Sequence, residues 1–290
     1  MKGIILAGGS GTRLYPITEA TSKQLTAIYD KPMIFYPLST LMSAGIRDIL
    51  IITTKEDQEG FKRLLKDGTE FGINIEYMIQ PSPDGLVQAF TLGEEFIGSE
   101  PVAMVLGDNI FYGAGIVDKL KQAAEDAKNG IATIFGYQVK DPQRFGIMEL
   151  DYNNKVIGVE EKPTNQKSDY EITGLYFYPK QVCNIAKTIQ PSVRGELEIT
   201  DLNNIYLNQG ILKAQLLNDG YIWFDTGTFE SMNDASNFVR STQIQGNRVI
   251  CSPEVIAYNN NWLTKETLSK RAELLKKNTY GKYLNEILRK

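Results

Sequence analysis

Short apolar runs alternate with helical patterns through the first half of the 290-residue chain. The apolar runs have the length of buried strands and are predicted as strands at residues 3–7, 48–53, 73–79, 102–106 and 131–139. Helices are predicted between them at residues 34–44, 55–66, 85–96 and 117–128. Gly45 and Gly130 follow two of these helices, where a left-handed cap favours glycine. This alternation predicts a mostly parallel sheet with helices on both faces.

The second half of the chain has a different pattern, with strands in close succession. These strands are predicted at residues 145–151, 155–160, 172–178, 213–217 and 222–224, with a turn at 151–154, a helix at 199–207 and further helices at the C-terminus. We therefore predict an α/β fold, a Rossmann-like three-layer αβα sandwich with a mostly parallel mixed central sheet, inserted antiparallel strands and a C-terminal helical appendage. Residues 1–240 would form the core, and residues 241–290 a helical region expected to contact other subunits.

The chain contains no histidine. This excludes Ser-His-Asp triads, Cys-His pairs, His-ligated zinc and histidine acid–base catalysis. Chemistry must then depend on carboxylates, lysine, arginine, backbone amides and a hard cation such as Mg²⁺.

Bulk properties of the sequence limit the cellular location and the partners that we expect. The net charge of −4 argues against a surface that coats nucleic acid. No apolar run reaches the roughly 18 residues that a membrane span needs. Cys183 and Cys251 are isolated in the sequence, which fits a reducing compartment. We expect a cytoplasmic protein with no membrane or nucleic-acid partner.

A glycine-rich loop follows the first predicted strand, in the segment IILAGGSGTRLYP at residues 4–16. Glycines at the end of a buried strand bring backbone N–H groups close to an anion. A Walker A loop is excluded because no lysine follows Gly11, and Leu14 stands where a dinucleotide fingerprint needs a small residue. Arg13 adds a permanent cation beside the amides. The loop predicts an anion site of another kind, and a simple chain-reversing turn is the alternative.

Carboxylates follow two apolar strands. Asp108 occurs in LGDNIFYG and Asp225 in YIWFDTGT. Ligands of open α/β sheets bind at the carboxyl ends of the strands, where a carboxylate can hold Mg²⁺ on a polyphosphate. An aspartate that only caps a turn is the alternative at each position.

Other polar segments could bind a ligand. In SKQL, Lys23, which Gln24 follows, adds a second cation, although most surface lysines are merely solvated. In EEKP, Lys162 could bind a further phosphate and Glu161 could accept sugar hydroxyls, and a charged turn is the alternative. Gln80, in the proline-shaped loop QPSPDGL, can read the edge of a base with both a donor and an acceptor.

The segment RGELEITD carries Arg194 together with Glu196 and Glu198. We assign most of this charged cluster to the solvated start of a helix.

These motifs follow one another in a single order across residues 2 to 228, as KGIILAGGSGTRLYP, SKQL, QPSPDGL, LGDNIFYG, EEKP, TGLYFY, RGELEITD and WFDTGT. The set resembles the sugar nucleotidylyltransferase family, and the combination is most similar to its thymidylyl branch, the glucose-1-phosphate thymidylyltransferases. The resemblance weakens after about residue 240. Phe145 is a departure from the family pattern, because tyrosine is frequent there and the ring here lacks the hydroxyl.

The resemblance implies roles for the residues that match these motifs. The catalytic residues would be Arg13, Lys23 and Lys162. The nucleotide would be bound by Leu6, Gly8, Gly9, Ser10, Gly11, Thr12, Gln24, Gln80, Pro83, Asp84 and Gly85. The sugar phosphate would be bound by Asn109, Phe145, Gly146, Glu161, Lys162, Thr173 and Arg194. The cofactor would be Mg²⁺, held by Asp108 and Asp225.

The resemblance also implies a reaction and an assembly. A phosphate oxygen of glucose 1-phosphate would attack the α-phosphorus of dTTP in line, giving dTDP-glucose and pyrophosphate. That oxygen is already ionised at neutral pH, so no general base is needed, which fits the absence of histidine. The protein would be a homotetramer, a dimer of dimers. The same reaction with UTP is an alternative, as is a non-catalytic regulator that binds sugar nucleotides. An NAD-dependent oxidoreductase is disfavoured by Leu14.

Overall fold

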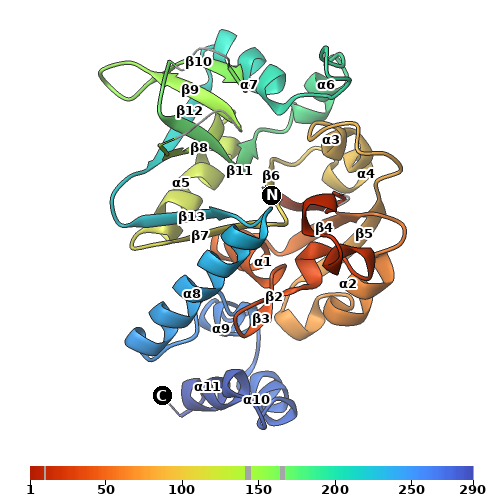
Figure 1. Ribbon diagram of the computed structural model, residues 1–290, viewed down its shortest axis with the longest axis vertical. Helices are drawn as coiled ribbons and strands as arrows, with labels where there is room; N and C mark the ends of the chain where they lie inside the picture. The colour runs from red at the N-terminus through yellow and green to blue at the C-terminus, as the bar shows by residue number, and fades with distance from the viewer. Residues whose placement is uncertain (10, 141–144, 164–166, 290) are drawn as a thin grey trace.

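A mixed sheet forms the centre of the protein (Figure 1). The computed structural model describes residues 1–9, 11–140, 145–163 and 167–289. The sheet strands within them are β1 (Lys2–Ala7), β4 (Asp48–Thr53), β5 (Asn74–Ile79), β6 (Val102–Leu106), β8 (Ala132–Gln138), β9 (Gly146–Leu150), β10 (Val156–Glu161), β11 (Tyr170–Tyr178) and β12 (Leu212–Leu217). Their order is β10-β9-β11-β6-β1-β4-β5, with β8 paired to β11 and β12 paired to β8.

The centre of the sheet is parallel. β1 pairs with β4 on one side and with β6 on the other, and β5 continues the parallel set beyond β4. These strands read as continuous apolar runs because both of their faces are covered. β11 then pairs antiparallel with β6, which makes the sheet mixed. Both features confirm the predicted fold class.

Helices cover both faces of the sheet. They are α1 (Phe35–Ser43), α2 (Gln58–Leu65), α3 (Gln88–Leu92), α4 (Glu94–Ile97), α5 (Ile116–Lys128), α6 (Val182–Ala186) and α7 (Ile199–Asn208). Ile5 of β1 packs in one core with side chains of α1, α2 and α5, whereas Ile4 packs in a second core with side chains of α3, α4, α6 and α7. Neighbouring residues of one strand therefore supply the two cores on opposite faces.

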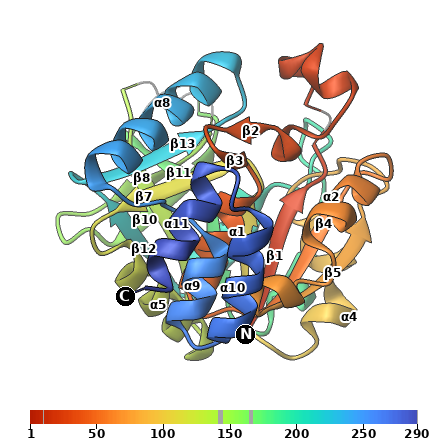
Figure 2. The ribbon, with the colours of Figure 1, turned by 90° about the horizontal axis from the view of Figure 1, so that it is seen from below.

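The remaining elements lie beside and below the sheet. They are β2 (Ala27–Ile28), β3 (Lys31–Pro32), β7 (Asn109–Gly113), β13 (Tyr221–Asp225), α8 (Phe229–Gly246), α9 (Pro253–Asn259), α10 (Lys265–Leu274) and α11 (Thr279–Ile287). β7 and β13 form an antiparallel ribbon, against which α8 packs. The helices α9, α10 and α11 gather beneath α1 (Figure 2). In the described part of the chain, no helix has both the length and the apolar character needed to cross a membrane.

Several local features differ from the sequence expectation, and the elements β2, β3, β7 and α6 were not predicted. The helix predicted over residues 85–96 is divided at Gly93 into α3 and α4. β7 was not predicted, because only the two-residue turn at Gly107 and Asp108 separates it from β6. α8 runs across the expected boundary between residues 240 and 241, so the division into two regions stays a prediction.

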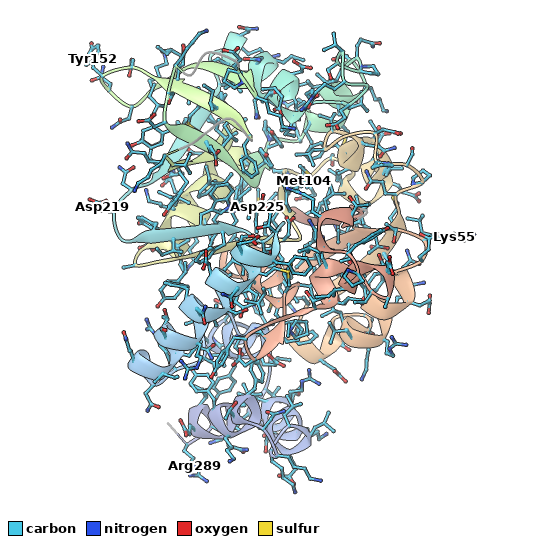
Figure 3. All side chains as sticks on the ribbon, viewed as in Figure 1. Lys55, Met104, Tyr152, Asp219, Asp225 and Arg289 are labelled. Atoms are coloured by element: carbon cyan, nitrogen blue, oxygen red, sulfur yellow. The ribbon has the colours of Figure 1, made fainter. Side chains whose placement is uncertain are left out.

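Other turn predictions are confirmed. Gly45 and Gly130 have φ values of 86° and 83°, which are left-handed helix caps. The turn at residues 151–154 is held by the Asp151 side chain, which accepts hydrogen bonds from the backbone N–H groups of Asn153 and Lys155 at 2.8 and 2.9 Å. Tyr152 projects from the tip of this hairpin (Figure 3).

A buried carboxylate ties the C-terminal helices together. Glu254 on α9 has no exposed surface, and its Oε1 accepts a hydrogen bond from Nε of Arg271 on α10 at 3.0 Å. Its other oxygen accepts from the hydroxyl of Tyr280 on α11. Arg271 also reaches Glu70, in the short 3₁₀ helix that precedes β5, at 3.5 Å. One ion-pair network therefore joins the three helices to the sheet domain.

Removing the cation of this network should destabilise the fold. Arg271→Met keeps the length of the side chain but leaves the buried charge of Glu254 without its partner, at an expected cost of about 3 kcal/mol in the free energy of unfolding. Urea denaturation measures this cost. The control is Lys276→Met, which removes an exposed ion pair with Glu273 and should cost about 0.5 kcal/mol or less. Equal effects of the two substitutions would contradict the assignment.

Candidate active site

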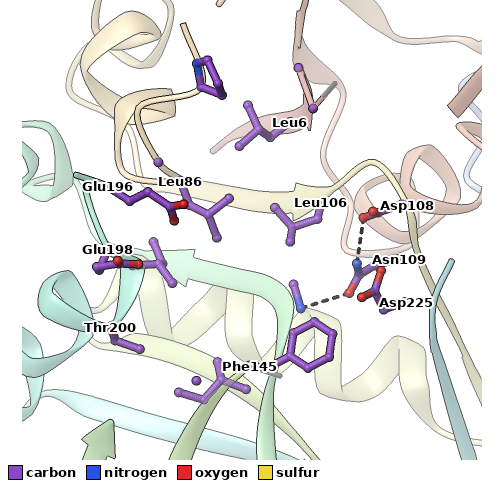
Figure 4. Close-up of a pocket in the computed structure, with 18 of the residues that line it drawn as sticks. Leu6, Leu86, Leu106, Asp108, Asn109, Phe145, Glu196, Glu198, Thr200 and Asp225 are labelled. Carbon is purple, nitrogen blue, oxygen red and sulfur yellow. Dashed lines mark hydrogen bonds between the residues drawn. The ribbon is translucent and has the colours of Figure 1, made fainter. Parts of the chain in front are cut away.

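A cavity of about 580 Å³ opens where β1 and β6 end. It has a wall from each half of the chain. Asp108, Asn109 and Asp225 lie at one end, and Glu196, Glu198 and Thr200 lie at the other (Figure 4). The cavity collects most of the predicted site residues, namely Leu6, Gly8, Gly9, Arg13, Lys23, Gln24, Gln80, Pro83, Gly85, Asp108, Asn109, Phe145, Gly146, Glu161, Lys162, Arg194 and Asp225.

A few of the predicted residues are placed elsewhere. Ser10 lies outside the described residues. Gly11 and Thr12 form the start of a short 3₁₀ helix, in which Gly11 has φ 63° and its carbonyl accepts a hydrogen bond from Thr18 at 2.7 Å. Asp84 is exposed and does not line the cavity, although its neighbours Pro83 and Gly85 do. The nucleotide contacts of these residues stay predictions.

Thr173 is also absent from the cavity wall. Its neighbours Ile172 and Gly174 line the cavity, and alternate residues of a strand face opposite sides, so the Thr173 side chain points to the other face of β11. Its hydroxyl is buried and has no hydrogen-bond partner among the described residues. This placement leaves only the main chain of Thr173 for the predicted sugar contact.

Glycines allow close approaches at the β1 end of the cavity. A Cβ on Gly8 would lie 2.1 Å from Oε1 of Gln80, so a side chain there would displace that amide. A Cβ on Gly227 would lie 3.0 Å from Nη2 of Arg13 and 3.2 Å from Oδ1 of Asp225. The guanidinium of the glycine-rich loop and the carboxylate at the end of β13 therefore meet beside Gly227.

An ion pair joins the glycine-rich segment to the end of β6. The Lys23 ammonium donates to Oδ2 of Asp108, and both side chains are largely buried. Burial alone would raise the pKa of Asp108, but the Lys23 charge and the hydrogen bonds from Lys23 and Asn109 hold that pKa below its usual value. Asp108 is therefore ionised at neutral pH, and its charge is balanced by Lys23.

The two predicted metal ligands are held next to each other by Thr226. Its backbone N–H and its hydroxyl both donate to the carbonyl oxygen of Asp108, at 3.0 and 2.7 Å. Thr226 is fully buried and directly follows Asp225, which pairs with Asn109 across the β7–β13 ribbon. Segments distant in sequence thus place their carboxylates at one end of the cavity (Figure 4).

The donor chemistry of this end fits a magnesium ion. Within the described residues, no cluster of three or more Asp, Glu, Cys or His side chains could hold a metal on its own. Asp108 and Asp225 provide two hard oxygen ligands, and Mg²⁺ is commonly bound by one or two carboxylates together with phosphate oxygens and water. The pair suits a metal that arrives with a polyphosphate.

Hydrogen bonds hold the side chain of Asn109 in the cavity wall. Its Oδ1 accepts from the backbone N–H of Gly174 at 3.0 Å and from Nε1 of Trp223 at 2.7 Å. Its Nδ2 donates to Oδ1 of Asp108 at 3.0 Å. The predicted sugar-phosphate contact could use only the remaining N–H of this amide, whose orientation is fixed by its two donors. The observed role of Asn109 is to join β11, β13 and Asp108.

Charged side chains crowd the opposite end of the cavity. Arg194 Nη2 lies 2.8 Å from both carboxylate oxygens of Glu198, and its Nε is 3.1 Å from one of them. Glu161 accepts a further bond from Arg194 at 3.2 Å and one from Thr200 at 3.2 Å. Arg194 is thus held by carboxylates, and a phosphate would have to compete with them.

This arrangement corrects the assignment to a solvated helix start for Glu198, whereas Arg194 and Glu196 are exposed as expected, although both line the cavity. Glu198 is 7% exposed and lines the cavity just before α7. Burial raises the pKa of Glu161, and the nearby charge of Glu198 raises it further, against the lowering effect of Lys162 and Arg194. The spacing of Arg194 and Glu198 fits an ion pair, but nothing local in the sequence places that pair in a cavity.

Lys162 adopts an unusual backbone conformation for its position. Its φ is 41°, although a residue before proline normally has an extended conformation. Its backbone N–H donates to the carbonyl of Phe145 at 3.2 Å, and its exposed ammonium lies 3.8 Å from Glu161. The turn after β10 therefore presents Lys162 at the cavity mouth beside Glu161.

Two loops of the cavity touch through their backbones. Gly85 has φ 117°, and a Cβ there would lie 2.5 Å from both the nitrogen and the oxygen of Leu197. The Leu197 N–H donates to the carbonyl of Asp84 at 2.7 Å. Only glycine allows this contact between the loop after β5 and the segment before α7.

Some of the lining residues were not assigned by the sequence analysis. Ile172, Gly174 and Tyr176 lie on one face of β11, and strand alternation could have identified them once the neighbouring strands with Gly146 and Glu161 were assigned to the site. The other residues reach the cavity only through tertiary packing. The unassigned residues are Leu86, Leu106, Ile172, Gly174, Tyr176, Glu196, Glu198, Ile199 and Thr200.

Comparisons with known proteins identify the family of the chain. Residues 2–242 match the family model described as nucleotidyl transferase. A glucose-1-phosphate thymidylyltransferase of Neisseria meningitidis is 57% identical over 290 residues, all of both chains, and one of Mycobacterium tuberculosis is 51% identical over 99% of both chains. A solved Bacillus anthracis structure in complex with sucrose is 41% identical, with TM-score 0.76 over 83% of this chain and 95% of that chain.

A more distant structure shows the same fold. It is a UDP-glucose pyrophosphorylase complexed with UDP-glucose, which is 23% identical and has TM-score 0.74 over 83% of this chain and 98% of that chain. The family match covers most of the sequence, and the relatives are similar along its whole length. The chain belongs to the nucleotidyl transferase family and, within it, to the glucose-1-phosphate thymidylyltransferases.

Proposed function

We propose that the cavity joins glucose 1-phosphate to the thymidylyl group of dTTP, giving dTDP-glucose and pyrophosphate. The substrates come from the name shared by the relatives of similar length. The observation that carries the proposal is the charge pattern of the cavity. Lys23 pairs with Asp108, and Arg13 lies beside Asp225 at one end, while Lys162 and Arg194 lie beside Glu161 at the other. Each end offers cations to one phosphate-bearing substrate. The expected homotetramer stays a prediction.

The proposed step is an in-line displacement at phosphorus. An oxygen of the sugar phosphate forms a bond to the α-phosphorus, and the bond from that phosphorus to the oxygen bridging to the β-phosphorus breaks. The electron pair leaves with pyrophosphate. The attacking oxygen is ionised at neutral pH, so the absence of histidine is no obstacle. Catalysis then consists of positioning and charge neutralisation.

The residues at the glycine-rich end would bind the triphosphate. Gly8 and Gly9 line the cavity after β1, with Arg13 beside them. Lys23 is paired with Asp108 and can turn to a phosphate only if another cation balances that carboxylate. A magnesium ion at Asp108 and Asp225 would supply this balance and neutralise phosphate oxygens.

The residues at the other end would bind the sugar phosphate. Lys162 is exposed at the cavity mouth and can reach a phosphate without breaking a buried pair. Glu161 has a carboxylate suited to accept hydrogen bonds from sugar hydroxyls, and Thr200 and Arg194 hold it in place. Phe145 packs edge to face on Trp223, with ring centroids 5.5 Å apart, which forms an apolar wall.

The reaction can be tested by pyrophosphate release from the purified protein. The assay pairs dTTP or UTP with several hexose 1-phosphates, in magnesium and in chelator. Release with dTTP and glucose 1-phosphate that depends on magnesium supports the proposal. No release from any pair, or equal release in chelator, contradicts it.

Lys162→Ala should lower kcat by about 100-fold or more and raise KM for the sugar phosphate, because a cation is lost where charge develops. Steady-state kinetics measure both effects. Lys167→Ala is the matched control, since Lys167 is also exposed and pairs with Glu160 outside this cavity. Kinetics of Lys162→Ala like those of the wild type would remove the assigned role.

Asp108→Asn should weaken magnesium-dependent activity by about 100-fold, because a neutral amide is a poor ligand for this metal. The substitution keeps the shape of the side chain, and rates measured across a magnesium titration show the effect. Asp219→Asn, at an exposed turn, should leave the titration unchanged. An unaltered magnesium dependence of Asp108→Asn would argue against its role as a ligand.

Protonation of Glu161 should make kcat/KM fall at the acidic side, or acidic limb, of its pH profile. Because the pKa of this carboxyl is raised, its charged form is lost as pH falls at a higher pH than for a free glutamate, and sugar binding should weaken there. Glu198→Gln removes a repulsive charge and should move this limb of kcat/KM to lower pH. A limb that stays in place, or moves to higher pH, would contradict the assignment.

A further inference from the structure

A chain of hydrogen bonds runs from Asp84 to the cavity through two amide side chains. Nε2 of Gln88 donates to Oδ2 of Asp84 at 2.7 Å, and Nε2 of Gln80 donates to Oε1 of Gln88 at 2.7 Å. Gln80 and Gln88 are 9% and 8% exposed. Only Gln80 belongs to the cavity wall.

The carboxylate sets the direction of this chain. An ionised aspartate can only accept hydrogen bonds, so the NH₂ group of Gln88 must face Asp84. The carbonyl of Gln88 then faces Gln80, and the NH₂ group of Gln80 must turn toward Gln88. The carbonyl oxygen of Gln80 is left on the cavity side, where it lies against Gly8. Gln80 therefore presents an acceptor.

A second glutamine offers the opposite group. Gln24 is 2% exposed and lines the same end of the cavity. Its Oε1 accepts a hydrogen bond from the Ser22 hydroxyl at 2.5 Å, so its NH₂ group remains to donate. The two amides together offer one donor and one acceptor to the edge of a base.

We propose that Asp84 and Gln88 are specificity-determining residues, which act through Gln80 by fixing its carbonyl toward the base. This inference rests on the proposed function and deepens it. Such a site selects a base that presents a ring N–H beside a keto oxygen, as thymine and uracil do. Cytosine presents a ring nitrogen acceptor beside an amino group, so the order of donor and acceptor is reversed.

The selection is energetic as well as geometric. Cytosine would place its ring nitrogen lone pair against the carbonyl oxygen of Gln80, and neither acceptor would have a donor. Groups that lose their partners inside a cavity cost more than a hydrogen bond contributes, so such sites reject a mismatched ligand strongly. The hydrogen-bond chain from Asp84 through Gln88 to Gln80, called the relay below, adds no discrimination between thymine and uracil, which share this edge.

Asp84→Asn is the decisive variant, because it keeps the shape of the side chain and gives it a donor. The asparagine NH₂ group can donate to Gln88, so the relay can run in either direction and Gln80 can present its own NH₂ group. The binding preference for dTTP over dCTP should fall by about 10-fold, the value of one hydrogen bond. The preference for dTTP over UTP should stay the same.

The measurement is titration calorimetry of each nucleotide with magnesium and without sugar phosphate, so that it does not depend on turnover. Gln88→Leu breaks the relay by another route and should give the same loss. The control is Ser82→Ala, which removes a hydroxyl that donates to the same Asp84 oxygen at 2.7 Å but leaves the relay in place. Its preference should match that of the wild type.

Several outcomes would overturn the inference. The wild type could bind dTTP and dCTP equally, or folded Asp84→Asn and Gln88→Leu could keep the wild-type preference for dTTP over dCTP. An equal loss of the preference for dTTP over UTP would also overturn it, because that result would indicate general damage to the site. If the expected shifts in binding occur but no pyrophosphate is released, the proposed reaction fails while the relay stands.

Discussion

The ion pair between Lys23 and Asp108 connects the two segments from which the cavity is built. Lys23 follows the glycine-rich loop after β1, and Asp108 follows β6, the parallel neighbour of β1. Both charges are largely buried, so removing either partner would leave the other charge unpaired and destabilise the folded protein. Asn109 and Thr226 extend the connection to β11 and to the β7–β13 ribbon. The geometry of the β1 end of the cavity thus depends on this ion pair. A nucleotide that draws Lys23 away would have to bring a cation that pairs with Asp108 instead.

The two ends of the cavity handle charge differently. Two unit negative charges in near contact, about 4 Å apart, repel each other by roughly 4 kcal/mol at an effective dielectric constant of about 20, and phosphate groups carry at least one such charge each. In the proposed reaction the end near β1 would counter this with Arg13 and Lys23, whereas the far end holds Arg194 among the carboxylates of Glu161 and Glu198. The far end would therefore suit hydroxyl groups as much as phosphate, and Lys162 is more exposed there than Arg194.

Local sequence predicts the sheet well because β4 and β6 are buried on both faces and read as continuous apolar runs. It predicts the site residues through motifs, and most of them do line one cavity. It fails where a role depends on a partner far away in the chain. Glu198 looks like a solvated helix start until Arg194 and the cavity are placed around it, and the Asn109 amide acquires its role from Gly174 and Trp223. Thr173 differs for a simpler reason, since strand register turns its side chain to the other face.

The close approach of Gly85 to Leu197 has a consequence for how such a protein could diversify. The loop that carries Gln80 and the segment that carries Arg194 and Glu198 share a backbone contact that leaves no space for a side chain. A displacement on either side is transmitted directly to the other, because main-chain atoms cannot rotate away as side chains do. If these two segments bind the base and the sugar as proposed, the choice of nucleotide and the choice of sugar would be mechanically linked, and a lineage that acquired a new sugar preference would tend to change base recognition at the same time.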